Sequence, residues 1–257
     1  MLIDTHTHIY LPDFANDIES VLDRARLAGV THCCLPAIDS ETHDLVIGLE
    51  SRFPGSCHAM IGLHPCSVNE RVEEELALVR SWLEKRPFIA IGETGLDFYW
   101  DKTFVQEQEM ALRRQMEWAI EFNLPIVLHT RDANQAVIDI AKEYAPRGLR
   151  GVFHCFGGTY EEASQITDMG FFMGIGGVLT YKKSGLQELM PMLSIDHIVL
   201  ETDAPYLSPV PYRGKRNEPS YLTQVFDLMA RVLNMEKNAL EEKLTENSLR
   251  LFPSLKG

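Results

Sequence analysis

Short runs of apolar, mostly β-branched residues recur along the chain, and longer segments with helical periodicity separate them. Several runs are continuously apolar rather than alternating with polar residues, which is typical of strands buried on both faces of a parallel sheet. The pattern predicts eight strands, at residues 2–4, 31–35, 58–62, 88–92, 125–128, 151–153, 171–175 and 197–200.

Amphipathic helical patterns lie between these strands. Within residues 104–122, for example, Leu112, Met116 and Ala119 share one face of a helix. The last pattern places Leu240, Leu244 and Leu251 on one stripe and predicts an extra helix at the C-terminal end. The clearest predicted helices cover residues 17–28, 70–85, 104–122, 221–233 and 236–251.

The alternation of strand and helix predicts the fold class. Eight such repeats in 257 residues favour an α/β fold that closes into a single (β/α)8 TIM barrel, with the extra C-terminal helix packed against it. An open, doubly wound sheet is the alternative, but the glycine-rich dinucleotide fingerprint is missing after the first strand. We therefore expect one domain over residues 1–257.

Composition and charge limit the classes of function. The five cysteines are odd in number and form no C-x-x-C pair, which favours reduced thiols in a cytoplasm. Neither a signal peptide nor a membrane span is predicted, and no obligate protein partner is evident. The formal net charge of −13 disfavours an extended DNA-binding surface, but it leaves room for a phosphate held by bound cations.

Histidines and carboxylates follow most of the predicted strands. In a TIM barrel the C-terminal ends of all strands meet at one face, where catalytic groups lie. Imidazoles and carboxylates without cysteine are typical ligands of catalytic zinc, manganese, iron or magnesium. The polar side chains at these strand ends are His6, His8, His64, Glu93, Asp97, His129, His154, Glu201 and Asp203.

The spacing of these residues predicts a site for two divalent ions (Mg, Mn or Zn). His6 and His8 are two residues apart on a strand, so both imidazoles can reach the same ion. A single histidine at a strand end more often forms a hydrogen bond, but this many ligands at neighbouring strand ends favour metal binding. We predict His6, His8, Glu93 and Asp203 on one ion, and Glu93, His129 and His154 on the other, with Glu93 as the bridge.

Roles beyond metal binding are also predicted. Asp203 is the predicted catalytic residue, because it is placed to orient or deprotonate a metal-bound water. Arg131 and Arg213 are expected to contact a phosphate group of the substrate. His64 is either a contact to the substrate or a turn residue before Pro65. The histidines that do not follow strands look structural: His32, His43, His58 and His197.

Motifs in a fixed order carry a resemblance to a known family. They are IDTHTH at 3–8, GLHP at 62–65, IGETGLD at 91–97, LHTRDA at 128–133, HCFGG at 154–158, LETDAPYL at 200–207 and RGKRNEP at 213–219. Together they span nearly the whole chain, which resembles the TatD-type metal-dependent deoxyribonucleases of the amidohydrolase superfamily. The resemblance implies a TIM barrel, the two-metal site assigned above, and hydrolysis of DNA phosphodiester bonds by a metal-activated water.

Two positions depart from the family's pattern. Tyr10 stands where an acidic or amide residue is usual, and Gln135 stands where an acidic residue is common. Two other functions stay open at this point. A related hydrolase would act on a small amide, ester or lactone through the same site, and a non-catalytic metal-binding protein would use the site for binding alone.

Overall fold

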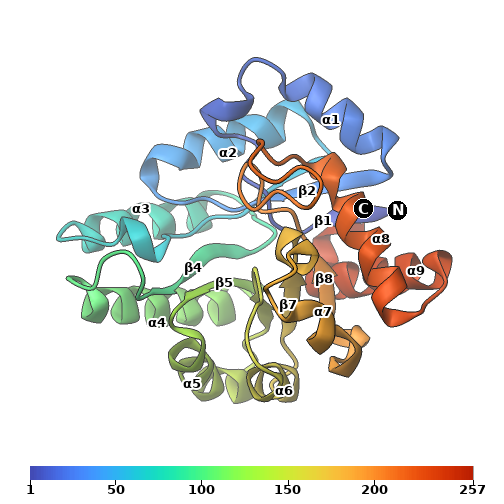
Figure 1. The fold of residues 1–257 in the computed structure, drawn as a ribbon. Helices are drawn as coiled ribbons and strands as arrows, with labels where there is room; N and C mark the ends of the chain where they lie inside the picture. Colours follow the sequence, from blue (N-terminus) through green and yellow to red (C-terminus); the bar gives the residue numbers. More distant parts are fainter. Residues whose placement is uncertain (257) are drawn as a thin grey trace.

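Short parallel strands form the centre of the molecule, and helices surround them (Figure 1). The computed structural model describes residues 1–256. The strands are β1 (Leu2–Asp4), β2 (Val30–Leu35), β3 (Cys57–Ala59), β4 (Ile91–Asp97), β5 (Ile126–Arg131), β6 (Gly151–Phe153), β7 (Phe172–Ile175) and β8 (Ile198–Leu200). The helices are α1 (Ile18–Leu27), α2 (Ser40–Arg52), α3 (Val72–Lys85), α4 (Val105–Glu121), α5 (Asn134–Tyr144), α6 (Tyr160–Asp168), α7 (Leu186–Leu189), α8 (Leu222–Leu233) and α9 (Lys237–Leu251).

The strands close into a barrel. They pair in the orders β1-β2-β3 and β4-β5-β6-β7-β8. Backbone hydrogen bonds join the two sheets at both edges: the Gly92 amide donates to the Ile61 carbonyl at 2.9 Å, and the Thr5 amide donates to the Leu200 carbonyl at 3.0 Å. This arrangement confirms the predicted TIM barrel and excludes the open sheet, because no strand edge between β8 and β1 is left unpaired.

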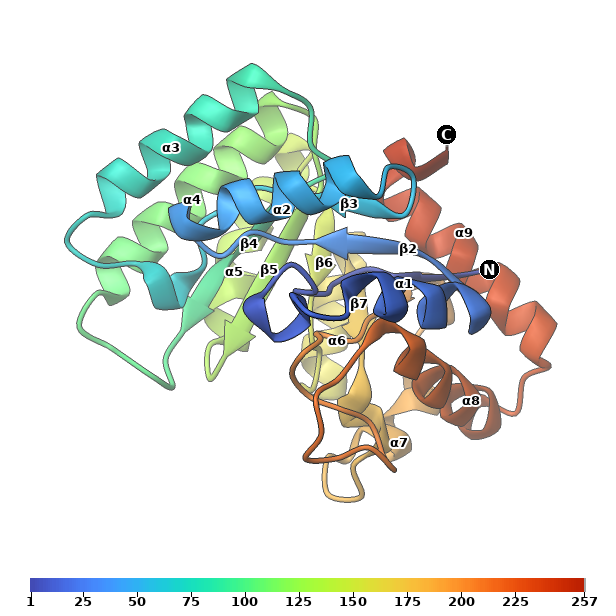
Figure 2. The same ribbon diagram turned by 90° about the horizontal axis from the view of Figure 1, so that it is seen from above.

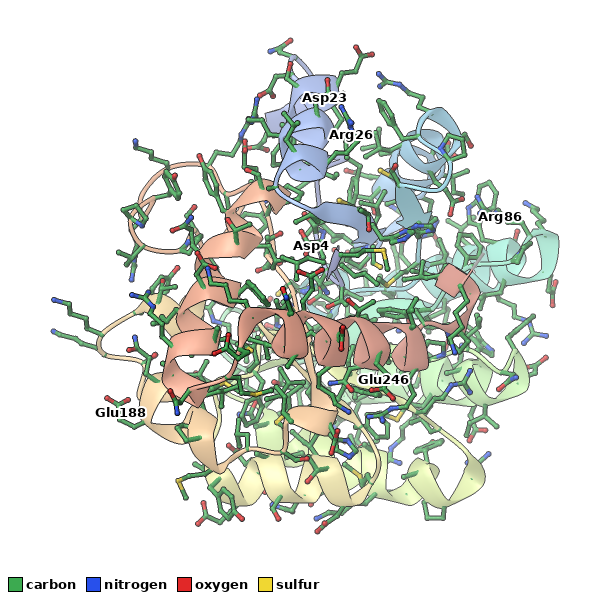
Figure 3. The ribbon with its side chains drawn as sticks, turned by 90° about the vertical axis from the view of Figure 1, so that its right-hand side faces the viewer. Asp4, Asp23, Arg26, Arg86, Glu188 and Glu246 are labelled. Carbon is green, nitrogen blue, oxygen red and sulfur yellow. The ribbon has the colours of Figure 1, made fainter. Side chains whose placement is uncertain are left out.

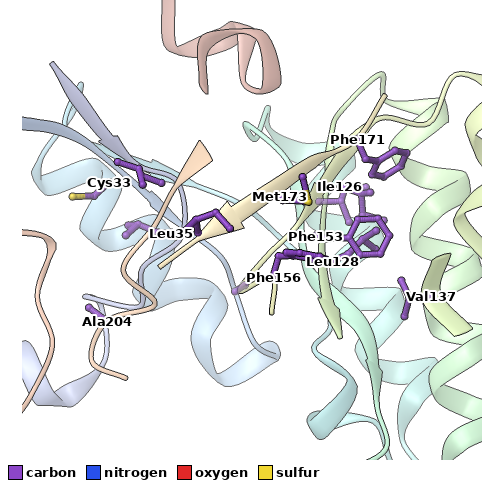
Figure 4. Close-up of a cluster of buried hydrophobic side chains, with 14 of the residues drawn as sticks. Cys33, Leu35, Ile126, Leu128, Val137, Phe153, Phe156, Phe171, Met173 and Ala204 are labelled. Carbon is purple, nitrogen blue, oxygen red and sulfur yellow. The ribbon is translucent and has the colours of Figure 1, made fainter. Parts of the chain in front are cut away.

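Two apolar layers hold the barrel together. Outward-facing side chains such as Leu35, Leu128 and Met173 pack against the surrounding helices (Figure 4). Side chains at alternate positions fill the interior, so the barrel is a packed core and not a pore. The inner layer consists of Ile3, Cys34, Met60, Ile89, Ala90, Val127, Val152, Phe172 and Val199, joined by Leu251, Phe252 and Leu255 from the chain's last segment.

The two ends of the barrel differ. The arrows of β4 and β5 point toward the end where the long segment 201–218 lies, whereas the C terminus lies at the other end (Figure 2). Charged side chains such as Asp23, Arg26 and Glu246 lie on the surface, whereas Asp4 is buried inside the molecule (Figure 3). Within residues 1–256, no helix is both long and apolar enough to cross a membrane.

Some predicted boundaries were wrong. The predicted fourth strand ended at Gly92, but β4 continues to Asp97, and β5 continues to Arg131 instead of ending at Leu128. Both strands end in polar residues, among them Glu93 and His129, so the apolar pattern stops before the strand does. Helices α2, α5, α6 and α7 were not singled out individually, although the alternation of strand and helix requires helices at these places.

Candidate metal centre

The ends of β1 and β8 bring the first group of polar side chains together. His6 Nε2 and His8 Nε2 lie 3.2 Å apart, and both face Asp203 Oδ1, at 3.7 and 3.4 Å. Backbone hydrogen bonds fix this arrangement, because the Asp203 amide donates to the His6 carbonyl at 2.9 Å and the His8 amide donates to the Ala204 carbonyl at 2.7 Å. The two histidines and Asp203 form one compact group of possible metal ligands.

A second group lies on the opposite side of Glu93. Glu93 Oε1 lies 2.9 Å from His129 Nδ1, 3.1 Å from His154 Nε2 and 3.4 Å from His64 Nε2. His64 and His129 form one compact group with Glu93, whereas His154 groups with Glu93 and His6. His64, predicted as a substrate contact or a turn residue, therefore lies within the cluster.

Glu93 connects the two groups. Its Oε2 atom faces His6 Nε2 at 3.1 Å, while its Oε1 atom faces the second group. The side chain is buried, and burial alone would raise its pKa; the neighbouring His154, His64 and His6 nevertheless hold that pKa well below its ordinary value. A carboxylate that stays ionised and offers one oxygen to each side has the geometry of a bridging ligand.

Side chains behind the imidazoles orient the rings. The Tyr10 hydroxyl donates to the Pro36 carbonyl at 2.7 Å, so its oxygen is left to accept from His8 Nδ1 at 2.8 Å. On the other side of the cluster, His129 Nε2 lies 3.0 Å from Asp97 Oδ2. Both contacts favour a tautomer in which the remaining ring nitrogen of the histidine presents its lone pair to the cluster.

Glu201 has a similar position behind His154. Its Oε1 atom accepts a hydrogen bond from the Cys155 amide at 2.5 Å and lies 3.3 Å from His154 Nδ1. Gly174 leaves room for this carboxylate, because a Cβ atom there would lie 2.1 Å from Glu201 Oε2. Glu201 is thus a buried carboxylate beside a candidate ligand.

His6 and Asp203 fit a divalent cation by the chemistry of their ligand atoms. Burial, followed by the neighbouring His154, lowers the pKa of His6, so this imidazole favours its neutral form. Asp203 has a lowered pKa although burial opposes its ionisation, because the nearby histidines outweigh burial. Neutral imidazoles and ionised carboxylates are the ligands that zinc, manganese and magnesium take in catalytic sites.

The remaining predicted residues lie around the mouth or on the surface. The Arg131 and Arg213 guanidinium groups each lie over an aromatic ring at the mouth. Gln135 lies on α5, where it bonds to Asp139 and not to the cluster. His32 and His58 bond to each other at 2.9 Å, remote from the candidate ligands. The aromatic residues Tyr10, Tyr99 and Trp100 were not predicted as part of the site.

The fold and the site together define a class of protein. A barrel that gathers imidazoles and carboxylates at its C-terminal mouth is an arrangement of metal-dependent hydrolases. The sequence profile of the family described as TatD related DNase matches residues 3–253, and the chain belongs to this family. This match confirms the resemblance inferred from the motifs.

Individual relatives agree with this assignment. The chain is 36% identical over 253 residues to the uncharacterized metal-dependent hydrolase YabD of Bacillus subtilis, covering 98% of this chain and 99% of the relative. It is 33% identical over 257 residues to the 3'-5' ssDNA/RNA exonuclease TatD of Erwinia tasmaniensis, with the same coverage. The crystal structure of YjjV, a TatD homolog from Escherichia coli K12, matches with a TM-score of 0.93 at 29% identity and 98% coverage of both chains. The protein is a metal-dependent hydrolase.

Proposed function

We propose that this protein shortens single-stranded DNA or RNA from the 3′ end by hydrolysing phosphodiester bonds at the barrel mouth. The observation that carries the proposal is Glu93, whose two carboxylate oxygens face different candidate metal ligands, with His6 at one oxygen and His129 and His154 at the other. Such a two-ion arrangement is common in enzymes that cleave phosphodiesters. The relative from Erwinia tasmaniensis, named as a 3'-5' ssDNA/RNA exonuclease, supports the choice of substrate.

The ligand assignment made from the sequence is part of this proposal. When bound, two divalent cations polarise a phosphoryl oxygen and make a water molecule more acidic. We assign His6, His8, Glu93 and Asp203 to one ion and Glu93, His129 and His154 to the other, with His64 beside the second.

Asp203 is the proposed proton acceptor. Its lowered pKa keeps the carboxylate ionised near neutral pH, so it can take a proton from the attacking water. Asp203 also has a positive φ of 56°, a conformation that aspartate tolerates better than most residues. The Asp203 backbone is held in place by its hydrogen bond to the His6 carbonyl, so the carboxylate has little freedom to turn away.

The substrate class is tested with a panel of compounds. Single-stranded DNA and RNA labelled at either end, duplex DNA, and small esters and lactones are each incubated with Mg²⁺, Mn²⁺, Zn²⁺ or EDTA. We expect strands labelled at the 5′ end to shorten progressively, and EDTA to stop the reaction. Turnover of carbonyl substrates alone, with intact nucleic acid, would overturn the proposal.

The role of Asp203 is tested by Asp203→Asn, assayed at saturating metal. We expect kcat to fall about 10²–10⁴-fold with little change in KM, because the substitution removes a proton acceptor more than a binding contact. Asp139→Asn on the surface of α5 is the matched control and should keep wild-type kcat. A near-normal kcat for Asp203→Asn would remove this residue as the base.

We also propose that the protein is located in the cytoplasm, because its five cysteines are free thiols. Residues 1–257 are proposed to form a single domain. Fractionation of cells that produce the protein would test the location.

A further inference from the structure

Two arginines at the barrel mouth differ from the other arginines of the molecule. Within residues 1–256, every other arginine forms an ion pair or a side-chain hydrogen bond, whereas Arg131 and Arg213 form neither. Both are exposed. In a chain with a net charge of −13, carboxylates are plentiful, so two guanidinium groups without a partner indicate a surface that receives an anionic ligand.

Arg131 is part of an exposed aromatic cluster. Its guanidinium carbon lies 3.9 Å from the centre of the Tyr99 ring and 5.1 Å from that of Trp100. The two aromatic rings are 53% and 67% exposed and meet edge to face, with centroids 4.9 Å apart. We call Tyr99, Trp100 and Arg131 the aromatic platform. Large aromatic surfaces left in water at one place commonly mark a binding site.

The platform is joined to the candidate metal centre through one carboxylate. Asp97 Oδ1 accepts hydrogen bonds from the backbone amides of Tyr99 at 2.9 Å and Trp100 at 3.1 Å. The other oxygen of Asp97 lies 3.0 Å from His129 Nε2. The platform is thus held next to a proposed ligand, and the segment that carries it extends from the same end of the barrel as segment 201–218 (Figure 2).

Arg213 and Tyr181 form a second stack of the same kind. The Arg213 guanidinium carbon lies 3.8 Å from the centre of the Tyr181 ring, which follows β7. Nearby, the Tyr206 ring is 53% exposed and its centroid lies 6.2 Å from that of His8. Exposed aromatic rings therefore lie near His8 as well as near His129.

We propose that the aromatic platform stacks the unpaired nucleobases of a single-stranded nucleic acid and so presents its terminal phosphodiester to the metal centre. The proposal rests on the function proposed above and assigns a binding role to Tyr99 and Trp100. Bases of a single strand stack on aromatic side chains and on arginine planes with little sequence preference. Bases within a duplex are already stacked and paired, so the platform selects single strands.

The platform is tested by binding in EDTA, which prevents hydrolysis. Fluorescein-labelled oligothymidine and an abasic strand of equal length and charge are titrated with wild type, Trp100→Ala and Arg131→Ala. We expect Trp100→Ala to raise the Kd for oligothymidine roughly 5- to 100-fold, and the Kd for the abasic strand less than about two-fold. Trp100→Phe, which keeps a ring, should restore most of the binding.

Controls separate stacking from other effects. Met192→Ala removes another exposed apolar side chain, in the turn between α7 and β8, and should leave both Kd values unchanged. Oligothymidine should also quench tryptophan fluorescence in wild type more strongly than in Trp100→Phe. An equal rise of both Kd values in Trp100→Ala, or no rise of either in that variant, would overturn the platform. Base-dependent binding without hydrolysis under any metal would keep the platform and remove the proposed function.

Discussion

Tyr10 sets the direction in which His8 presents its ring nitrogen. The family usually has an acidic or amide residue at this position, and the tyrosine hydroxyl takes over as a hydrogen-bond acceptor because its own proton is given to the Pro36 carbonyl. A phenol oxygen is neutral, so it orients the imidazole without adding another negative charge near Glu93.

Tyr10→Phe removes this acceptor and keeps the ring. We expect affinity for Mn²⁺ or Zn²⁺ to fall about ten-fold, the lower end of the effect of losing a group that orients a metal-binding histidine. Isothermal titration calorimetry of the metal-free protein measures the change. Tyr160→Phe at the exposed start of α6 is the control, and equal affinities in all three proteins would show that Tyr10 has no such role.

Residue patterns predicted the metal centre better than its surroundings. His6, His8, Glu93 and Asp203 were predicted as ligands because histidines and carboxylates at strand ends are unusual, and the structure brings these side chains close together. Tyr10 was noted only as a departure, since a tyrosine near a strand is ordinarily a packing residue. The pair Tyr99-Trp100 was missed for the same reason: aromatic residues are apolar in a sequence pattern, whether they lie in a core or in water.

At the scale of elements, the start of α6 carries a helix-capping signal in the sequence that was not used to predict this helix. Thr159 and Glu162 form a capping box, in which each side chain accepts a hydrogen bond from the backbone amide of the other. The sequence TYEE at 159–162 contains this signature, but only Ala163 and Ile166 of the short helix are buried, so its apolar periodicity is weak. The boundaries of β4 and β5 were missed because polar residues, among them the candidate ligands Glu93 and His129, interrupt the apolar pattern of the strand.

Thr159→Ala should lower the free energy of unfolding by about 1 kcal/mol, because it removes the acceptor for the Glu162 amide. Urea unfolding measures the loss, and Thr159→Ser, which keeps the hydroxyl, is the matched control. A stability equal to wild type in the alanine variant would show that α6 begins without help from this side chain.

β2 and β3 carry a partly buried histidine pair that links stability to pH. Burial, followed by the neighbouring His32, lowers the pKa of His58 from 6.5 to about 4. Between these two values the unfolded chain binds more protons at His58 than the folded chain does. The stabilising effect of a neutral His58 is therefore complete above pH 6.5 and is lost as the pH falls toward 4.

His58→Gln keeps a polar side chain and removes this titration. We expect the free energy of unfolding of wild type to fall more steeply than that of the variant when the pH is lowered from about 6.5 to about 4.5. Urea unfolding at several pH values measures both slopes. Identical slopes in the two proteins would show that His58 does not contribute to the acid sensitivity.

At the scale of the whole molecule, the candidate ligands come from strands that are far apart in sequence. Ions bound among His6, Glu93, His129, His154 and Asp203 would connect β1 and β8 to β4, β5 and β6. The unfolded chain cannot hold these residues together, so metal binding should stabilise the folded barrel.

Each bound ion at 100 times its Kd should stabilise the fold by about 2.7 kcal/mol, or roughly 5–10 °C in Tm for a chain of this size. Thermal unfolding with Mn²⁺ and with EDTA measures the shift. Glu93→Gln, which weakens the proposed bridge, should show a smaller shift. A Tm that is insensitive to every divalent ion would contradict metal binding at this place.

The packed interior of the barrel limits the paths by which a substrate can enter and a product can leave. Phe252 and Leu255 seal the end opposite the mouth, together with the inner side chains of the strands. A polymer therefore cannot thread through the ring, and every product must leave by the opening through which its parent strand arrived.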